Sequence, residues 1–339
     1  MSRSFRTALA AFLLLTVTSP SVAEDLGGPS SPMERSRALD QLDRRLAHYV
    51  AWRRIPDIRA RLQERRAVYL AQPTTDGFLT MVNADLYAIS QDRHLQVWVE
   101  PRSRDAPTPP ADPAGADSAQ PDFGLRTVRR QGRVAVLELT EVSGDARAAA
   151  ALDRAMEALR GAEVLILDLR NNGGGGEVVQ RRLLGHLAAS PLPLEEIRFR
   201  HCEPDPGDRE GCLQDGRVDI ETRTADRVDQ PAFPTQPIFI LTSGRTFSAA
   251  EAIAYNLQAT RHAVVVGETS GGGANPSAGM DLGPWFTVVM PIATTVLSAT
   301  GTNWEGVGVH PDVPAPASSA MEAVLALASA AANTQPSGD

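Results

Sequence analysis

The sequence predicts an α/β domain built on a largely parallel sheet and preceded by a small helical domain. Three observations support this prediction. From residue 132 onward, short and continuously apolar segments alternate with helical ones, as in sheets that are covered on both faces. Between residues 33 and 90, apolar residues recur at three- and four-residue steps. Residues 101–127, which lie between the two patterns, are rich in proline and predict a linker or loop.

Residues 1–23 predict a signal peptide rather than part of the fold. Arg3 and Arg6 give a short basic region, and residues 8–17 form an apolar run too short to be a stable membrane anchor. The small residues at 21–23 (SVA) favour cleavage by signal peptidase. An uncleaved N-terminal anchor is the alternative. We therefore expect an exported protein, periplasmic or secreted, with no stable membrane span.

Each further element follows from its local pattern. Residues 33–100 are expected to form the helical N-terminal domain, interrupted at Pro56 and Pro73. Residues 128–320 are expected to form the α/β domain, and residues 321–339 a closing helix and tail. Within the α/β domain, strands are expected at residues 133–140, 164–169, 237–241, 263–267 and 285–292, and helices at residues 145–160, 176–189 and 248–258.

Composition excludes several classes of function. The net charge is −8, which argues against a nucleic-acid-binding surface. All 33 basic residues are arginine, because the chain contains no lysine. Mechanisms that need a lysine amine, such as a Ser/Lys dyad or a phosphate-binding loop, are therefore excluded. No cofactor is expected.

The chain contains two cysteines, Cys202 and Cys212. In an exported protein this spacing predicts a disulfide that closes the loop between them. Two free thiols are the alternative. A metal site is not expected, because only His201 adjoins the pair and there is no second cysteine pair.

Four consecutive glycines, residues 173–176, follow one expected strand and precede a helix. Sites in open α/β sheets gather at the carboxyl ends of the strands. Bare backbone amides at such a turn bind an anion, either a phosphate or a transient oxyanion. A flexible turn between strand and helix is the structural alternative.

Ser248 stands in a similar place, after the next buried strand and at the start of a helix. A hydroxyl there is suited to act as a nucleophile, since the helix dipole favours the charge that develops on attack. Ser248 and Glu251 also match a capping box, which needs no catalytic role. Histidines and acids elsewhere supply candidate partners for the hydroxyl: His94, His262, His310, Glu251, Glu268 and Glu305.

The order of four motifs resembles the tail-specific proteases, also called C-terminal processing peptidases. The motifs are residues 165–175 (LILDLRNNGGG), 246–251 (TFSAAE), 266–272 (VGETSGG) and 306–312 (GVGVHPD). The resemblance implies a crotonase-like (ClpP/crotonase) catalytic domain and a serine peptidase acting on protein or peptide substrates. The helical part resembles the N-terminal region of the subgroup that includes the interphotoreceptor retinoid-binding modules and many bacterial exported hydrolases.

The chain departs from the best-known members, which carry a PDZ domain and use a Ser/Lys dyad. Here a Pro-rich stretch replaces the PDZ domain and lysine is absent. The resemblance therefore points to the branch with Ser, His and Glu, which includes the tricorn-type proteases. It implies Ser248 as nucleophile, His94 as general base and Glu305 as orienting acid, with Gly174 and Ala249 donating the oxyanion-hole amides.

An exported serine peptidase is the favoured function. A non-catalytic module that binds apolar ligands such as retinoids or fatty acids is the alternative on the same fold. The joint presence of Ser248, His94 and Glu305 favours the enzyme. Acyl-CoA chemistry would rest on fold analogy alone, and export separates the protein from CoA. The sequence does not specify the substrate or the oligomeric state.

Overall fold

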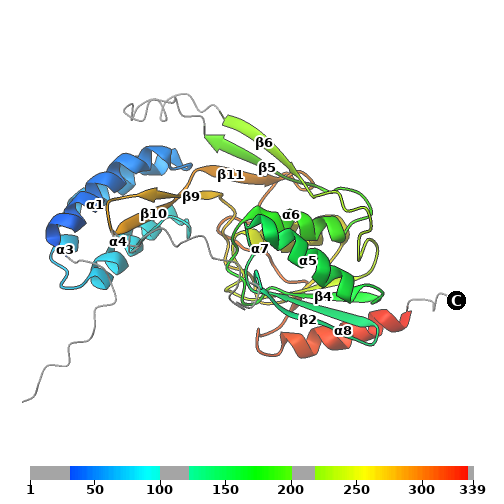
Figure 1. The fold of residues 1–339 in the computed structure, drawn as a ribbon. Helices are drawn as coiled ribbons and strands as arrows, with labels where there is room; N and C mark the ends of the chain where they lie inside the picture. The colour runs from blue at the N-terminus through cyan, green and yellow to red at the C-terminus, as the bar shows by residue number, and fades with distance from the viewer. Residues whose placement is uncertain (1–30, 100–121, 201–217, 335–339) are drawn as a thin grey trace, which may run out of the picture.

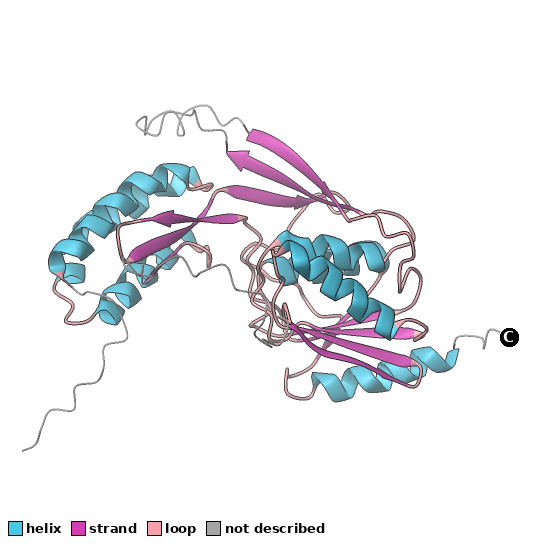
Figure 2. Ribbon diagram, in the orientation of Figure 1, coloured by secondary structure: helices cyan, strands magenta, loops and turns pink. Residues whose placement is uncertain are grey.

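The computed structural model describes residues 31–99, 122–200 and 218–334. A helical part and an α/β part lie at opposite ends of the ribbon, with two small sheets between them (Figures 1 and 2). The helical part contains α1 (Pro32–Arg45), α2 (Ile55–Glu64), α3 (Arg66–Leu70) and α4 (Thr75–Ser90), with short 3₁₀ turns η1 (Leu46–His48) and η2 (Trp52–Arg54).

The central sheet has six strands in the order β12-β8-β7-β4-β3-β2. All neighbours are parallel except β2, which is antiparallel to β3. The mostly parallel α/β prediction is thus confirmed, but residues 125–127 of the expected linker belong to β2. The strands are β2 (Leu125–Gln131), β3 (Val134–Leu139), β4 (Val164–Asp168), β7 (Ile238–Thr242), β8 (Val264–Gly267) and β12 (Val313–Pro314).

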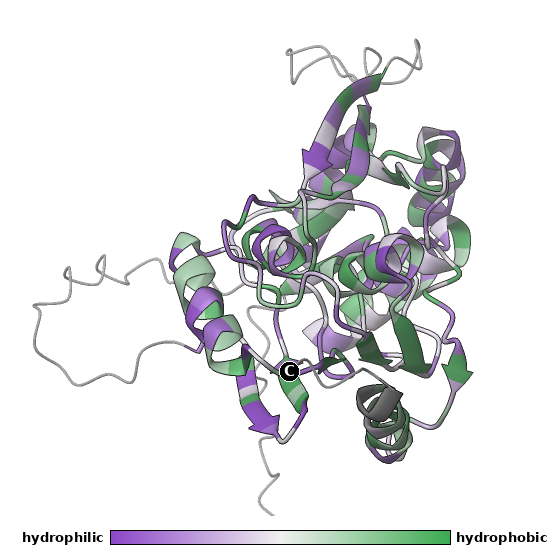
Figure 3. Ribbon diagram, turned by 90° about the vertical axis from the view of Figure 1, so that its right-hand side faces the viewer, coloured by the Kyte–Doolittle hydropathy of each residue, from purple (hydrophilic) through white to green (hydrophobic). Residues whose placement is uncertain are grey.

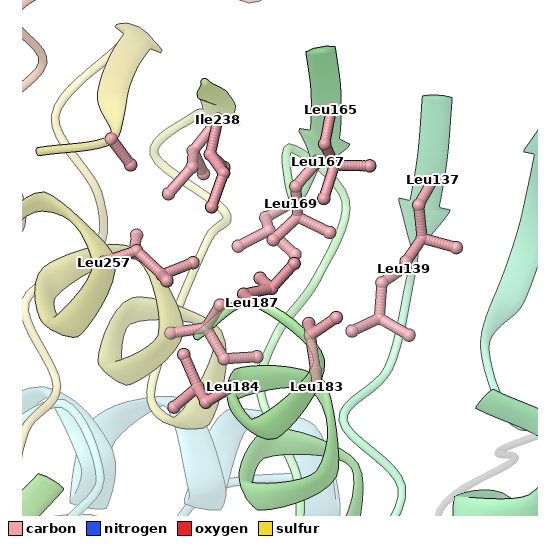
Figure 4. Close-up of a cluster of buried hydrophobic side chains, with 14 of the residues drawn as sticks. Leu137, Leu139, Leu165, Leu167, Leu169, Leu183, Leu184, Leu187, Ile238 and Leu257 are labelled. Carbon is pink, nitrogen blue, oxygen red and sulfur yellow. The ribbon is translucent and has the colours of Figure 1, made fainter. Parts of the chain in front are cut away.

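Helices cover both faces of this sheet because its central strands are apolar on both sides. One face packs against α5 (Ala146–Leu159), α6 (Glu177–His186) and α7 (Ala249–Arg261), and the other against α8 (Ala320–Thr334). Figure 4 shows leucines of β3 and β4 facing those of α6 and α7. Apolar colour gathers in the interior strands, whereas the helices carry both colours (Figure 3). This packing fixes the strand ends that carry the loops described below.

Two three-stranded sheets join the ends of the molecule. One has the order β1-β10-β9, and the other β11-β5-β6. Apart from β10, these strands were not expected from the sequence, because they are short or rich in polar residues. Their bounds are β1 (Gln96–Val99), β5 (Pro193–Arg200), β6 (Val218–Thr224), β9 (Ser277–Asp281), β10 (Phe286–Pro291) and β11 (Ala293–Leu297).

The N-terminal helices do not have a hydrophobic core to themselves. Buried side chains of α1, α2 and α4 form one cluster with Val97 of β1 and with Phe286, Val288 and Met290 of β10. The rings of Phe78 and Phe286 meet edge to face, with 5.6 Å between their centroids. The helical part is therefore anchored by β1, which follows it directly, and by β10, where Phe286 lies 208 residues after Phe78.

Some expectations lie outside the described residues. These are the signal peptide, most of the expected linker, and the pair Cys202 and Cys212, whose disulfide stays a prediction. In the ranges that are described, no helix is both long and apolar enough to cross a membrane. Those same ranges hold no cluster of three or more His, Cys, Asp or Glu side chains suited to a metal ion.

Candidate active site

Three loops meet at the carboxyl-terminal edge of the central sheet, after β4, β7 and β8. Thr246 ties the first two together, since its hydroxyl donates to the carbonyl of Leu169 at 2.8 Å. Gly271 ties in the third, since its amide donates to the carbonyl of Thr246 at 2.8 Å. The motifs that the sequence placed at this edge are therefore in contact.

Ser248 lies where the second loop enters α7. Its φ of 54° and ψ of −122° fall in a region that is unfavourable for residues with a side chain, and such strain concentrates at functional sites. Its amide donates to Glu251 at 2.8 Å, in the capping box expected from the sequence. Its hydroxyl lies 3.1 Å from Nε2 of His94. Starting the helix and presenting a hydroxyl to an imidazole are thus compatible roles.

His94 comes from the short segment between α4 and β1. Its ring packs against that of Phe247, with 4.6 Å between the centroids. Burial lowers the pKa of His94, although the charge of Asp92 opposes this shift. The neutral imidazole therefore dominates at neutral pH, with Nε2 placed to accept a proton from Ser248. A Cβ added at Gly273 would lie 2.7 Å from the imidazole, so the loop approaches His94 this closely only with glycine.

Asp92 lies near the second ring nitrogen of His94, and Glu305 is connected to Asp92 through Asn275. Oδ1 of Asp92 is 3.9 Å from Nδ1 of His94 and accepts the His94 amide at 2.9 Å. Asn275 connects the two acids: its side chain donates to Asp92 at 3.1 Å and its backbone amide to Glu305 at 3.0 Å. Nδ1 of His94 and Oε1 of Glu305 are both buried without a hydrogen-bond partner. The structure thus brings His94 to Ser248 and links Glu305 to Asp92 through Asn275, without a hydrogen bond between Glu305 and His94.

Glu305 has an unusual protonation behaviour. Burial raises its pKa to about 7, and the charge of Asp92 adds to the rise. The backbone amides of Ala274 and Asn275, which donate at 2.6 and 3.0 Å, oppose it. The carboxyl group therefore changes its charge near neutral pH. Sequence reasoning gave no role to Asp92, whose only signal is its position two residues before His94.

Glu251, one of the competing acids, anchors the loops beneath the site. Its side chain is fully buried. One carboxylate oxygen accepts from the hydroxyl of Ser270 at 2.5 Å and from the amide of Gly272 at 2.6 Å. The other accepts from the amides of Ser248 and Gly273, both at 2.8 Å. All four donors are thus committed to holding two loops together.

The glycine turn supports Ser248 from the opposite side. Gly174 has a φ of 99°, and a Cβ added there would lie 2.7 Å from Cβ of Ser248. Its amide, expected to face an oxyanion, donates instead to the side chain of Asn172 at 2.8 Å. Gly173 and Gly175 line the cavity beside Ser248. The turn therefore offers glycines other than Gly174 toward that space.

A cavity of about 490 Å³ opens beside the Ser248–His94 pair. This volume is within the range of small-molecule and side-chain subsites. Ala249, whose amide lies in the first turn of α7 and has no acceptor within the helix, is part of the wall. Other residues of the lining are Gln180, Glu177, Glu195, Arg223, Ile197, Ala252 and Trp304.

The remaining candidates lie elsewhere. His310 is exposed, and its Nδ1 is 3.3 Å from the hydroxyl of Thr269. His262 ends α7 and is exposed. Glu268 is exposed and accepts the amides of Gly244 and Ala317 at 3.3 and 2.9 Å. None of these side chains lines the cavity beside Ser248.

Solved structures of similar fold exist. A candidate peptidase from Parabacteroides merdae aligns over 91% of this chain and 100% of its own, with 15% identity and a TM-score of 0.60. A lipoprotein from Streptococcus agalactiae aligns over 89% and 97%, with 17% identity and a TM-score of 0.56. The photosystem II D1 C-terminal processing protease aligns over 57% of this chain and 46% of its own, with 20% identity and a TM-score of 0.40. This chain therefore spans less than half of that protease.

The family comparison is more direct, and it covers the central sheet except β2, together with all three loops of the site. The model of peptidase family S41 matches residues 133–315, which is more than half of the chain. The matched segment contains Ser248 and Glu305, whereas His94 precedes it. With its fold and this match, the chain belongs to peptidase family S41 and is a serine-type peptidase, as its four motifs had indicated.

Proposed function

We propose that this protein is an exported peptidase that hydrolyses peptide bonds with Ser248 as nucleophile, His94 as general base and Glu305 as orienting acid. The observation that supports this most is the 3.1 Å distance between Nε2 of His94 and the hydroxyl of Ser248. These residues are 154 positions apart in sequence, and a structural cap would not need the imidazole.

The proposed chemistry has two halves. His94 accepts the proton of Ser248 as the hydroxyl oxygen attacks the scissile carbonyl carbon, and then donates that proton to the departing amine. The acyl-enzyme is cleaved by water, which His94 deprotonates in the same way. In this proposal the first-turn amide of Ala249, together with that of Gly173 or Gly175, donates to the oxyanion; all three residues line the cavity beside Ser248. Each such donor contributes about 3 kcal/mol to the transition state.

Two buried atoms without hydrogen-bond partners support Glu305 as the orienting acid. A neutral imidazole that accepts at Nε2 carries its proton at Nδ1. This donor in His94, and the acceptor Oε1 of Glu305, are both buried and unpartnered. Leaving such groups unpaired is costly, and we propose that a hydrogen bond between them forms during catalysis. Asp92, whose Oδ1 lies 3.9 Å from Nδ1, adds a second negative charge that stabilises the imidazolium.

Two finer features belong to the same proposal. We propose a crotonase-like topology for the catalytic domain, without a PDZ domain, since the helical part and the two small sheets surround the site instead. Export rests on residues 1–23. The apolar-carrier alternative is disfavoured by the cavity wall, where Glu177, Glu195 and Arg223 place three charged side chains.

The deciding experiment is labelling with a fluorophosphonate probe, followed by peptide mapping. We expect one modified residue, Ser248, and no labelling or casein hydrolysis in Ser248→Ala. That variant should remain folded, because losing a helix-capping hydroxyl costs about 1 kcal/mol. His310→Ala is the matched control and should keep most activity. Labelling of another serine, or unchanged turnover in Ser248→Ala, would contradict the mechanism.

A further inference from the structure

Glu195 is a buried acid that the proposed catalytic mechanism does not use. It lies on β5, where the pairing with β6 shifts register between Pro193 and Glu196. Because of this bulge, Leu194 and Glu195 are both buried, whereas an even strand would alternate. Bulges of this kind redirect side chains next to active sites. Here the redirected side chain is a carboxylate that lines the cavity beside Ser248.

Both hydrogen bonds that the side chain of Glu195 accepts go to the same carboxylate oxygen. The side chains of Gln180 on α6 and Asn256 on α7 donate to the same oxygen, Oε1, at 2.9 and 2.8 Å. The other oxygen, Oε2, is buried and has no partner. Only 3% of the residue is exposed. A buried carboxylate with an unfilled acceptor is unfavourable by itself, so this arrangement suits a ligand that brings a donor.

The charges around the cavity favour a cationic ligand. Arg223 is the one cation among the described residues of the lining, and it is paired with Glu177 at 2.9 Å and with Glu221 at 3.3 Å. No ion pair joins it to Glu195 among those found in the described ranges. Glu177 and Glu195 therefore outnumber Arg223 on the wall, which leaves an excess of one negative charge when both acids are ionised. Burial raises the pKa of Glu195, and a bound cation would offset this effect.

We propose that the cavity is the subsite for the substrate residue on the acyl side of the scissile bond, and that Glu195 makes it selective for arginine or lysine. This inference rests on the proposed peptidase function. A volume of about 490 Å³ accommodates a long side chain. The guanidinium or ammonium group would donate a hydrogen bond to Oε2 of Glu195 and place a positive charge beside the carboxylate. Gln180 and Asn256 would hold the carboxylate in place.

The test compares two peptide amides of aminomethylcoumarin that differ only in the residue before the cleaved bond. One carries arginine and the other carries citrulline, which has nearly the same shape but no charge. We expect kcat/KM of the wild type to favour arginine by roughly 30-fold or more, as for a buried charge pair. In Glu195→Gln this preference should largely disappear, because kcat/KM for the arginine peptide falls much further than kcat/KM for the citrulline peptide.

The control is Glu196→Gln, the next residue on β5, which pairs with Arg198 at 2.9 Å and does not line the cavity. It should retain the arginine preference. Equal cleavage of both peptides by a wild type that the fluorophosphonate probe labels at Ser248 would overturn the subsite and leave the peptidase mechanism intact. Absence of both labelling and cleavage would overturn the proposed function and the subsite with it. If Glu195→Gln kept the preference for arginine, that preference would come from another residue, and the proposed role of Glu195 would be overturned.

Discussion

At the scale of single residues, the site combines groups whose local sequence favours plainer roles. Ser248 caps a helix through its amide and faces His94 through its hydroxyl. Glu251 is an acid close to Ser248 in the sequence and could be taken for a catalytic one. Its two oxygens accept four hydrogen bonds, however, so it acts as a structural anchor. Glu305 keeps one oxygen without a partner. Which acid is free to respond during a reaction is decided by its partners rather than by its position in a motif.

The protonation of His94 and Glu305 predicts the pH profile. Burial lowers the pKa of His94 from 6.5, so the base becomes active as the pH rises through a value below 6.5. Burial raises the pKa of Glu305 to about 7, so the orienting carboxylate forms only as the pH rises through that value. The wild-type kcat/KM should therefore rise in two steps toward alkaline pH.

The variant Glu305→Gln should remove the upper step and leave a weaker activity with the lower step alone. The measurement is kcat/KM between pH 5 and pH 9, with Glu268→Gln as the matched control that keeps both steps. An unchanged upper step in Glu305→Gln would exclude this carboxyl group as its source.

At the scale of elements, the loops after β4, β7 and β8 form a site because side chains bind them to one another. Glu251 is the most connected of these side chains. In Glu251→Gln, an amide nitrogen would replace one of the two accepting oxygens, which leaves at least one buried donor unpaired. The expected loss is about 1–3 kcal/mol of unfolding free energy per unpaired donor.

Thermal unfolding and kcat/KM should therefore both fall in Glu251→Gln, because Ser248 loses the acceptor for its amide. Glu268→Gln, on an exposed acid of the neighbouring loop, should lower the melting temperature less. A Glu251→Gln protein with wild-type melting temperature and turnover would show that the anchor is dispensable.

Local sequence patterns predicted some of the strands and missed others. Strands β3, β4, β7 and β8 were predicted because a strand covered on both faces is apolar throughout. Strand β6 has a polar and exposed pattern, and β9 is a short strand at a sheet edge, so neither gives a strong signal. The place of Ser248 after a buried strand made it a candidate nucleophile or a helix cap, and its assignment as nucleophile came from the resemblance to the tail-specific proteases. The pairing of Asp92 with Asn275 spans 183 residues, and no local pattern records such a contact.

At the scale of the whole molecule, the helical part and the catalytic part share strands and a hydrophobic cluster, so we expect them to unfold as one cooperative unit. Strand β1, which follows His94, pairs along its length with β10, and β10 shares its core with α4. In Phe78→Ala, the loss of the ring against Phe286 should cost about 3–5 kcal/mol. Because this strand pairing holds His94, turnover should decline in parallel with stability.

The measurement for Phe78→Ala is calorimetry together with activity as a function of temperature. We expect a single unfolding transition at lower temperature and loss of turnover across that transition. Val307→Ala, at an exposed side chain, is the control and should change neither. Two separate transitions, with activity surviving the first, would contradict the single unit.

The wide spacing of the site along the chain has a consequence for biosynthesis. His94 is made first, Ser248 follows 154 residues later, and Glu305 follows 57 residues after Ser248. A ribosome-bound or interrupted chain therefore contains the proposed base His94 without the proposed nucleophile Ser248, or both of these residues without Glu305. The strand that follows His94, β1, pairs with β10. His94 is therefore held in place only after β10 has been made. The order of synthesis thus delays assembly of the proposed site of His94, Ser248 and Glu305 until residue 305 has been made.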